Sequence, residues 1–310
     1  MPAGLLAYEV VDVFTDRAFA GNPLAVVHGT EELSDEQLLA LASEFNLSET
    51  TFPQPLTAAD VDAGADYRVR IFTPAGELPF AGHPTLGTAW ALHQRGTIEA
   101  GARLQSCGAG LIGVEIPTDP KAPVSLTATP RDVARELTPA QTEEAASLVG
   151  VPRSAVVGSA HLAGCGLTWL YLRITADAVS QARPSSRRVD AVELGQESLM
   201  DPLDGICVYA VQDADANADA EADLVIHARV FVPGLGIPED PATGSAAAGL
   251  GLVLVASGAA GPDGHTSYRI MQGVDMGRPS LLQGSVEARA GLGSAVTSRV
   301  RSLRWPPAQS

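Results

Sequence analysis

The sequence has 310 residues, of which 45% are hydrophobic and 18% charged, and its formal net charge is −16. This length fits two domains of about 150 residues each, and the apolar content is sufficient for two cores. The acidic balance argues against nucleic acid or an anionic membrane as a partner, although it does not exclude a small anionic substrate, because the field at a binding site is local.

The first elements predicted along the chain are two strands and a helix. Apolar residues favour strands over Tyr8–Phe14 and Leu24–Val27. Ser34 and Gln37 form a capping box, which indicates the start of a helix that ends at Asn46. Many turns are expected, because the chain contains 31 glycines and 22 prolines, so strands should outnumber helices.

A carboxylate follows this helix in the stretch Leu47–Phe52. Glu49 lies there among small hydroxyl residues and two apolar ones. Glutamate is depleted in strands and is rarely buried without a partner. Taken alone, the pattern therefore favours an exposed carboxylate in a strand or loop.

The middle and late parts of the chain read as a second domain rich in strands. Leu111–Ile116 is expected to close the first domain, and the Pro- and Thr-rich stretch Lys121–Pro130 to be a linker. Thr138 and Pro139 indicate a helix that runs to about Val149. Gln212–Asp223 is acidic and low in complexity, which is typical of a loop. The further strands expected are Ala155–Gly158, Thr168–Ile174, Gly205–Val211, Ser267–Met271, Gly284–Ala290 and Ala295–Leu303.

One long segment carries no charge. Pro241–Pro262 is uncharged over 22 residues, but only Leu250–Val255 is strongly apolar and the first half is Ala, Gly, Ser and Thr. A membrane span would need about 20 predominantly apolar residues. A helix without a polar face is more simply explained as one buried at the centre of a domain.

The most informative feature is an internal repeat. Arg70–Ala91 begins RIFTP and continues through HPTLGTA, while Arg229–Gly249 begins RVFVP and continues through DPATGSA. A repeat at about half the chain length predicts two similar domains. In each copy a strand leads through a turn to a helix, expected to start at Pro84 in the first and to be headed by Asp240 in the second. Open backbone N–H groups at a helix start can hold a carboxylate.

Two residues head these helices, His83 and Asp240. Either could simply cap its helix, although aspartate is a favoured cap and histidine is not. A small anionic substrate held between two helix starts is the simplest use of the repeated arrangement.

Three segments together resemble the PhzF-like phenazine biosynthesis family. They are NLSETTF from Asn46, FAGHPTLGTA from Phe80 and EDPATGSA from Glu239, and the stretches Val11–Val27 and Gly277–Ser280 are similar too. The resemblance implies an α+β fold of the diaminopimelate epimerase type. That fold has two pseudo-symmetric domains, each a curved, mostly antiparallel sheet around a central helix, with the site in the cleft between them. It implies domains of residues 1–125 and 126–291, with a C-terminal strand, residues 292–310, returning to the first.

The resemblance also assigns roles to residues. It places the general acid and base on Glu49 and assisting polar groups on His83, Asp240 and Ser245, which together form the expected catalytic set. The substrate carboxylate would be held by backbone N–H groups of the expected binding residues, which are Gly82, Thr243 and Gly244. The implied enzyme is an isomerase that needs no cofactor and no metal, acts on a small cyclic or amino-acid-like carboxylate, and forms a homodimer. A carboxylate buried in a closed cleft would have a raised pKa, as this chemistry requires.

Other functions stay open. Epimerases of this fold use two cysteines at the helix starts, but Cys107, Cys165 and Cys207 lie elsewhere. An epimerase that uses Glu49, or a metabolite-binding protein without turnover, remains an alternative. Metal-dependent hydrolysis and nucleotide binding have no support, because the sequence lacks HExxH, paired CxxC, GxGxxG and GKS/T motifs. The N-terminus has no basic region followed by an apolar core, so we expect no signal peptide and a cytoplasmic protein.

Overall fold

The chain forms two compact units, residues 1–126 with 299–310 and residues 127–298. The computed structural model describes residues 5–119, 122–128, 130, 134–184, 203–212, 222–232, 238–300 and 302–304, and side chains within these ranges as far as residue 293. Most of the expected acidic loop, residues 213–221, lies outside the described residues.

Unit 1 is a sheet with two longer helices and one short one. Its elements are β1 (Ala7–Val13), β2 (Asn22–His28), α1 (Asp35–Phe45), β3 (Glu49–Gln54), α2 (Ala58–Asp62), β4 (Tyr67–Thr73), β5 (Gly76–Leu78), α3 (Gly82–Gln94), β6 (Gly101–Cys107), β7 (Gly110–Ile116), β8 (Val124–Ala128), which crosses the boundary, and β18 (Ser302–Arg304). β18 pairs with β1, so the end of the chain joins the sheet of its beginning.

Unit 2 also consists of strands, two longer helices and one short helix, with an additional 3₁₀ turn. Its elements are β9 (Arg135–Glu136), α4 (Pro139–Leu148), the 3₁₀ turn η1 (Arg153–Ala155), β10 (His161–Cys165), β11 (Leu167–Arg173), α5 (Ala176–Val179), β12 (Gly205–Gln212), β13 (Leu224–Phe231), β14 (Glu239–Asp240), α6 (Gly244–Ala256), β15 (Gly264–Gln272), β16 (Ser280–Arg289) and β17 (Leu292–Val300).

The strand that carries the repeated motif has equivalent neighbours in both units. β4 pairs with β3 and β5 in antiparallel fashion and with β6 in parallel fashion. β13 pairs with β12 and β14 in antiparallel fashion and with β15 in parallel fashion. The repeat in the sequence is therefore a repeat of sheet topology.

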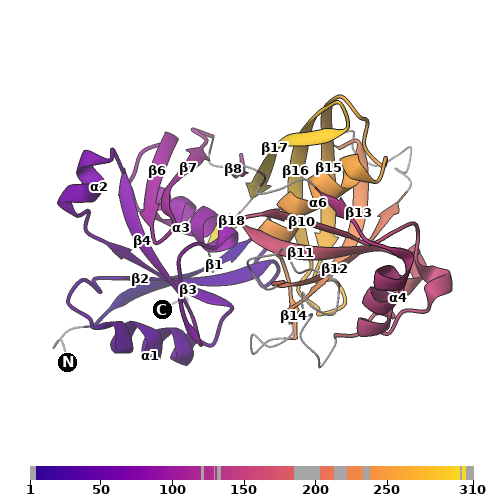
Figure 1. Cartoon of the computed structure of the whole chain (residues 1–310). Coiled ribbons are helices and arrows are strands. Elements are labelled where there is room, and N and C mark those ends of the chain that lie inside the picture. Colours follow the sequence, from indigo (N-terminus) through magenta and orange to yellow (C-terminus); the bar gives the residue numbers. More distant parts are fainter. Residues whose placement is uncertain are drawn as a thin grey trace. The chain divides into compact units, whose positions relative to one another are not determined.

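Each unit has one central helix, α3 or α6, in the crossover between its parallel strands (Figure 1). Helix α3 packs against β1, β2, β3 and β7, and α6 packs against β10, β11 and β16. All residues of Ala246–Val255 are buried. The uncharged run of the sequence is thus a helix at the centre of unit 2, as its composition predicts.

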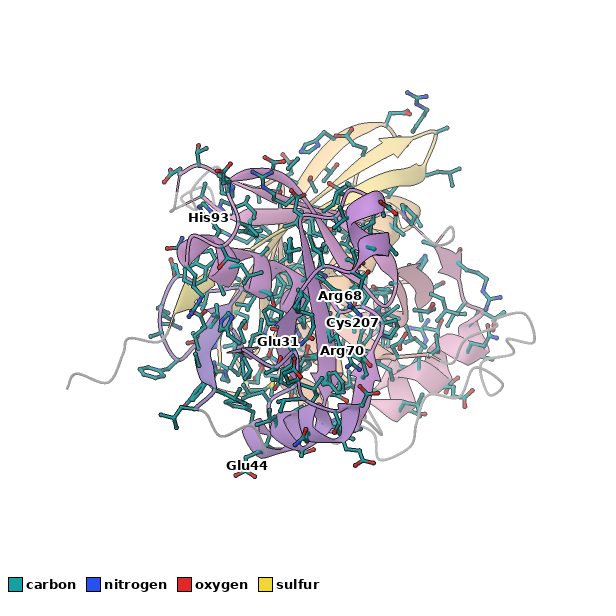
Figure 2. All side chains as sticks on the ribbon, turned by 90° about the vertical axis from the view of Figure 1, so that its left-hand side faces the viewer. Glu31, Glu44, Arg68, Arg70, His93 and Cys207 are labelled. Atoms are coloured by element: carbon teal, nitrogen blue, oxygen red, sulfur yellow. The ribbon has the colours of Figure 1, made fainter. Side chains whose placement is uncertain are left out.

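The outer face of the unit 1 sheet is covered by α1. Leu38 and Ala42 of this helix pack with Phe52 of β3 and Phe72 of β4. Along β4, buried residues alternate with Arg68 and Arg70, both labelled in Figure 2. This alternation is the period of two that the sequence predicts for the strand.

Local capping signals are confirmed and one strand prediction is wrong. The capping boxes at Ser34 and Thr138 are both present. In place of the strand expected at Ala155–Gly158, the chain makes the turn η1 and a single β-bridge from Val156 to Ile174. The expected linker Lys121–Pro130 contains β8, which pairs with β7, and the boundary between the two units falls within it.

Candidate functional site

In unit 1 the candidate site begins at the start of helix α3. The helix starts at Gly82, two residues before the position predicted from Pro84, so His83 lies inside its first turn. The N-cap residue Ala81 has an extended backbone (φ −149°, ψ 139°), and among the described residues no side chain caps the helix. Proline is accepted anywhere in the first turn because the N–H it lacks has no intrahelical partner there. The first N–H groups therefore remain available to an anion.

Glu49 is brought to this helix by β3. Its neighbour two positions along, Thr51, accepts a hydrogen bond from Thr88 of α3 (2.8 Å). Residues two apart share one face of a strand, so Glu49 faces the same helix. Its Oε2 lies 3.5 Å from Nδ1 of His83, and its side chain is only 15% exposed. The exposed carboxylate favoured by the local sequence alone is therefore a wrong interpretation.

His83 is buried and neutral. Its side chain is 6% exposed, and burial lowers its pKa to about 3. Within the described chain its Nε2 is buried without a hydrogen-bond partner. A neutral imidazole that faces a carboxylate through Nδ1 can donate a proton to it or accept one from it, depending on its tautomer.

Hydrogen bonds between buried side chains fix α3 on its sheet. Besides the bond between Thr88 and Thr51, Gln105 of β6 donates to Thr85 of α3 (2.9 Å). The side chains of Gln105, Thr51, Thr85 and Thr88 are all buried. The first two turns of the helix are thereby held against β6 and against β3, the strand that carries Glu49, which is the kind of support that a catalytic group requires.

In unit 2 the polar groups precede the helix instead of starting it. Asp240 lies in the short strand β14, and α6 begins only at Gly244, so Pro241 is not helical as the sequence suggested. The reason is a side-chain network. The amide of Gln272 donates to the Asp240 carbonyl (2.8 Å) and to Thr243 Oγ1 (3.1 Å), and its oxygen accepts from Thr243 N (3.3 Å). These bonds satisfy the backbone in an extended form.

The Thr243 hydroxyl completes this network by donating to Oδ2 of Asp240 (2.5 Å). Asp240 and Thr243 are 8% and 9% exposed. Ser245, in the first turn of α6, accepts a hydrogen bond from Nε1 of Trp169 (3.2 Å). The structure thus brings together all the residues predicted for this half of the site, which are Asp240, Thr243, Gly244 and Ser245.

Sequence reasoning missed the residues that hold this half in place. Gln272 lies 32 residues from Asp240, and Trp169 lies 76 residues from Ser245. Tyr171 and Tyr268 donate to the carbonyls of Ala246 and Ala247 in the first turns of α6 (2.9 and 3.0 Å). No local pattern announces such contacts. Only the repeated arginine of RIFTP and RVFVP could have drawn attention to the surroundings of Asp240.

None of the three cysteines belongs to a helix start. Cys107 ends β6, while Cys165 and Cys207 are buried in β10 and β12. Burial raises the pKa of Cys165 and that of Cys207 to about 12. A thiol in such an environment is a poor base, so the geometry offers no support for a cysteine-pair epimerase.

No three His, Cys, Asp or Glu side chains of the described chain gather in a way that could hold a metal ion. Within the same ranges, no helix has the length and apolar character needed to cross a membrane.

Comparison with known proteins identifies the family. The family described as phenazine biosynthesis-like protein (PhzC-PhzF) matches residues 11–300. The chain belongs to this family. It is 32% identical to trans-2,3-dihydro-3-hydroxyanthranilate isomerase of Pseudomonas chlororaphis, over 91% of each chain. It is 30% identical to antisense-enhancing sequence 1 of Schizosaccharomyces pombe, over 94% of this chain and 93% of the relative.

A solved structure agrees. The PhzF family protein of Bacillus anthracis superposes with a TM-score of 0.77, at 20% identity, over 97% of this chain and 99% of that one. The expected two-domain α+β fold is therefore confirmed, and so is the enzyme class, an isomerase of this family. The roles of individual residues, the homodimer, the cytoplasmic location and a site shared by the two units stay predictions.

Proposed function

We propose that this isomerase moves a proton on a small cyclic or amino-acid-like carboxylate, with Glu49 as general acid and base and without a cofactor. The observation that carries the proposal is the 3.5 Å approach of Glu49 to a buried, neutral His83 at a helix start without a side-chain cap. Perturbed titratable groups that converge on an anion-binding helix start are the usual mark of acid–base catalysis.

The proton follows a simple route in this proposal. The Glu49 carboxylate takes a proton from a substrate carbon, and the electron pair of the broken C–H bond moves into the substrate's π system. The new O–H bond of Glu49 then breaks as the same proton is delivered to another carbon, so the substrate is isomerised and Glu49 is regenerated. No group outside the protein and substrate is needed for the balance of atoms and electrons.

His83 has a defined part in this route. When Glu49 is ionised, the tautomer with a proton on Nδ1 can donate to the carboxylate. When Glu49 holds the substrate proton, its unprotonated oxygen can still accept from the same Nδ1–H, so His83 keeps one tautomer and its charge throughout the route.

Each helix start offers binding groups of its own. Backbone N–H groups near Gly82 in unit 1 and Gly244 in unit 2 can bind carboxylate oxygens. Asp240, Thr243 and Ser245 offer hydrogen-bond partners for a hydroxyl or amine on the substrate. We propose trans-2,3-dihydro-3-hydroxyanthranilate, on which the Pseudomonas chlororaphis relative acts by name, as the first substrate to test. It combines a ring carboxylate with an amine and a hydroxyl group.

Isotope incorporation tests the proposal. The protein is incubated in D₂O with trans-2,3-dihydro-3-hydroxyanthranilate and a panel of other cyclic and amino-acid carboxylates. Loss and gain of C–H protons are followed by NMR and mass spectrometry. Wild type should shift a proton in at least one compound, with deuterium entering at the position that receives it to the extent that Glu49 exchanges with solvent.

The isosteric Glu49→Gln variant is the control and should be inactive on the same compound. Turnover by this variant within about tenfold of wild type would remove Glu49 from the role, because general acid–base groups contribute about 10²- to 10⁴-fold. Inversion of a stereocentre without a shift of the double bonds would instead identify an epimerase.

A further inference from the structure

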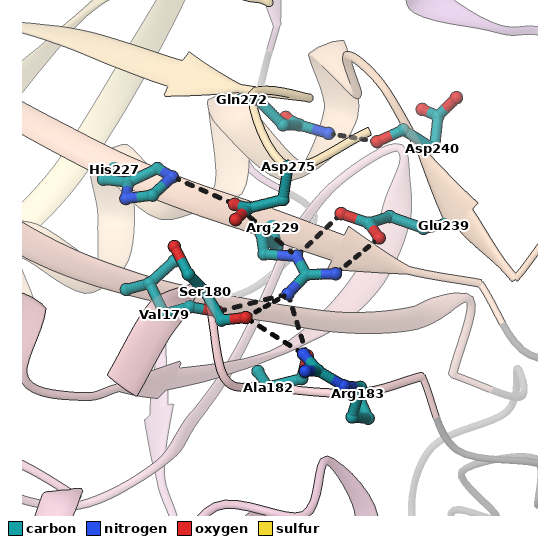
Figure 3. Close-up of polar contacts among 10 residues, drawn as sticks. All are labelled: Val179, Ser180, Ala182, Arg183, His227, Arg229, Glu239, Asp240, Gln272 and Asp275. Carbon is teal, nitrogen blue, oxygen red and sulfur yellow. Dashed lines mark hydrogen bonds and ion pairs between the residues drawn. The ribbon is translucent and has the colours of Figure 1, made fainter. Parts of the chain in front are cut away.

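Arg229 of β13 is the centre of a buried polar cluster beside the candidate site of unit 2. Its Nε and one terminal nitrogen donate to the two oxygens of Glu239, at 2.8 and 2.7 Å. The other terminal nitrogen donates to the carbonyl of Ala182 at 2.8 Å and to those of Val179 and Ser180 at 3.3 Å. Figure 3 shows these contacts converging on one guanidinium group.

The other neighbours of Arg229 leave it little freedom. Its guanidinium lies 5.0 Å from the ring centre of Phe231, within the range of a cation–π contact. Asp275 lies 4.0 Å from its Nε, and the same carboxylate lies 3.5 Å from Nε2 of His227. The side chains of Arg229 and Glu239 are only 7% and 10% exposed.

Glu239 connects this cluster to the candidate catalytic residue. It forms the two-residue strand β14 together with Asp240, and only two backbone pairs, Val230 with Asp240 and Phe231 with Glu239, join this strand to β13. Successive strand residues point to opposite sides. In Figure 3 the Glu239 carboxylate accordingly faces Arg229, while the Asp240 carboxylate points away from it. Fixing Glu239 therefore fixes the direction of Asp240.

Gln272 holds the same strand from the side of helix α6. It is 2% exposed, and its single amide group bonds to the Asp240 carbonyl and to both the N–H and the hydroxyl of Thr243. Asp240 thus has an anchor on each flank, through Glu239 and Arg229 on one and directly through Gln272 on the other.

A contribution to stability alone is a weak explanation for the buried ion pair. Removing two charges from water is costly, and apolar residues of similar volume often serve stability as well. A bidentate arginine–carboxylate pair does provide a fixed geometry. Here the pair fixes the short strand that carries Asp240.

We propose that Arg229 and Gln272 are positioning residues that hold Asp240 and Thr243 in the geometry required for the isomerisation, Arg229 acting through Glu239. This inference rests on the proposed function for its catalytic consequence, but its structural part can be tested without any substrate.

Trp169 provides the structural readout, because its indole N–H donates to Ser245 at the start of α6. The chain contains three tryptophans, Trp90, Trp169 and Trp305. In protein labelled with 5-fluorotryptophan they give three fluorine signals, and the Trp169→Phe and Trp90→Phe variants assign two of them. Arg229→Lys keeps the charge but loses the two-pronged contact, and Gln272→Leu removes the amide. Both should shift or broaden the Trp169 signal and leave that of Trp90 unchanged.

Arg70→Lys is the matched control. Arg70 is the equivalent arginine of the repeat in unit 1, and it pairs with Glu77 of β5. This variant should leave the Trp169 signal unchanged. A Trp169 signal that is identical in wild type, Arg229→Lys and Gln272→Leu would overturn the positioning role, whatever the reaction proves to be.

Kinetics on trans-2,3-dihydro-3-hydroxyanthranilate test the catalytic part. Misplacement of a catalytic group by about 1 Å can cost about 10²-fold in rate. We expect Arg229→Lys and Gln272→Leu to lower kcat about 10- to 100-fold while KM stays within about threefold, and Arg70→Lys to keep both values. A shifted Trp169 signal with kcat unchanged would overturn the catalytic part. Full activity of Glu49→Gln would instead remove the proposed function and leave the fluorine result standing.

Discussion

The starts of helices α3 and α6 are the most instructive pair of regions to compare. Both helices have 13 residues, follow the repeated strand and its short antiparallel partner, and lead into a strand parallel to the first. Yet the first presents a neutral histidine facing a carboxylate, whereas the second is preceded by an aspartate bonded to threonine and glutamine. The scaffold is repeated, but the polar chemistry is not.

The two repeated arginines show the same divergence. Arg70 and Arg229 each bind both oxygens of a glutamate and lie about 5 Å from a phenylalanine ring two residues on, at 5.1 and 5.0 Å. In unit 1 the side chains of the pair are 21% and 42% exposed, and in unit 2 they are 7% and 10% exposed. Exposed pairs contribute little to stability. The buried copy, next to Asp240, is therefore the one expected to matter for function.

The largest expected effect distinguishes a proton-transfer group from a binding group. Glu49→Gln should lower kcat about 10²- to 10⁴-fold, because it removes the acid and base. Asp240→Asn should lower kcat/KM about 10- to 100-fold, the range for one hydrogen bond to a charged group. Steady-state assays on the compound found in the D₂O screen give both values.

The control for this comparison is Glu77→Gln, which neutralises a more exposed carboxylate of the same unit. It should retain activity within about twofold. A larger loss for Asp240→Asn than for Glu49→Gln would reverse the assignment of the two helix starts.

The second prediction concerns the packing of the two helices. A methyl group added at Gly249 of α6 would lie 2.2 Å from the hydroxyl of Tyr171, which bonds to the carbonyl of Ala246. Gly249→Ala should therefore lower the free energy of unfolding by about 1–3 kcal/mol, through overpacking and loss of this bond.

Gly87 of α3 is the matched position in unit 1. A methyl group there would lie 2.7 Å from terminal methyl groups of Leu24 and Val13, and no hydrogen bond would have to break. Alanine also favours a helix over glycine by about 1 kcal/mol. In urea denaturation, Gly87→Ala should therefore lower the free energy of unfolding less than Gly249→Ala does. The opposite order would show that Tyr171 can move away from α6 at little cost.

The comparison also shows which features could be predicted from the sequence. The capping boxes at Ser34 and Thr138, the end of α1 at Asn46 and the burial of α6 depend on neighbouring residues, so their patterns were sufficient. The repeat predicted two related units because matched strands and helices need matched partners.

The helix starts were predicted less well because distant residues determine them. Prolines were expected to mark both starts, but Gln272 holds the backbone at Asp240 and Thr243 extended, so α6 starts at Gly244. Likewise, nothing in the segment around Glu49 shows that the strand turns this residue toward His83. That placement depends on the pairing of β3 and on the packing of α3.

The third prediction uses the lowered pKa of His83. Burial lowers this pKa to about 3, whereas an unfolded histidine has a value near 6.5. Between these values the unfolded chain binds a proton that the folded chain does not, so stability is highest above pH 6.5 and is lost as the pH falls. Between pH 7 and pH 5 the titration of this residue should lower the free energy of unfolding by about 1–2 kcal/mol.

His83→Gln removes this term, so its free energy of unfolding should fall less than that of wild type over the same range. Urea denaturation at pH 5, 6 and 7 measures the difference. His161 and His227, whose pKa values are also lowered by burial, are present in both proteins and cancel. If the free energy of unfolding falls equally with pH in the two proteins, folding does not lower the pKa of His83 and its burial does not keep it neutral at pH 5.

The smallest expected effect distinguishes proton transfer by Glu49 from proton transfer by a pair of cysteine thiols. Burial raises the pKa of Cys165 and that of Cys207 to about 12, so at pH 8 only about one thiol in 10⁴ is ionised and reactive. N-ethylmaleimide should label the partly exposed Cys107 first, and activity should stay within about twofold, because this residue belongs to β6 and is not one of the proposed catalytic or binding residues. Mass spectrometry of the labelled protein identifies the site. If activity falls in step with labelling of Cys165 or Cys207, a thiol takes part in proton transfer. The difference between the helix start with His83 and the one with Asp240 would then not explain the catalysis.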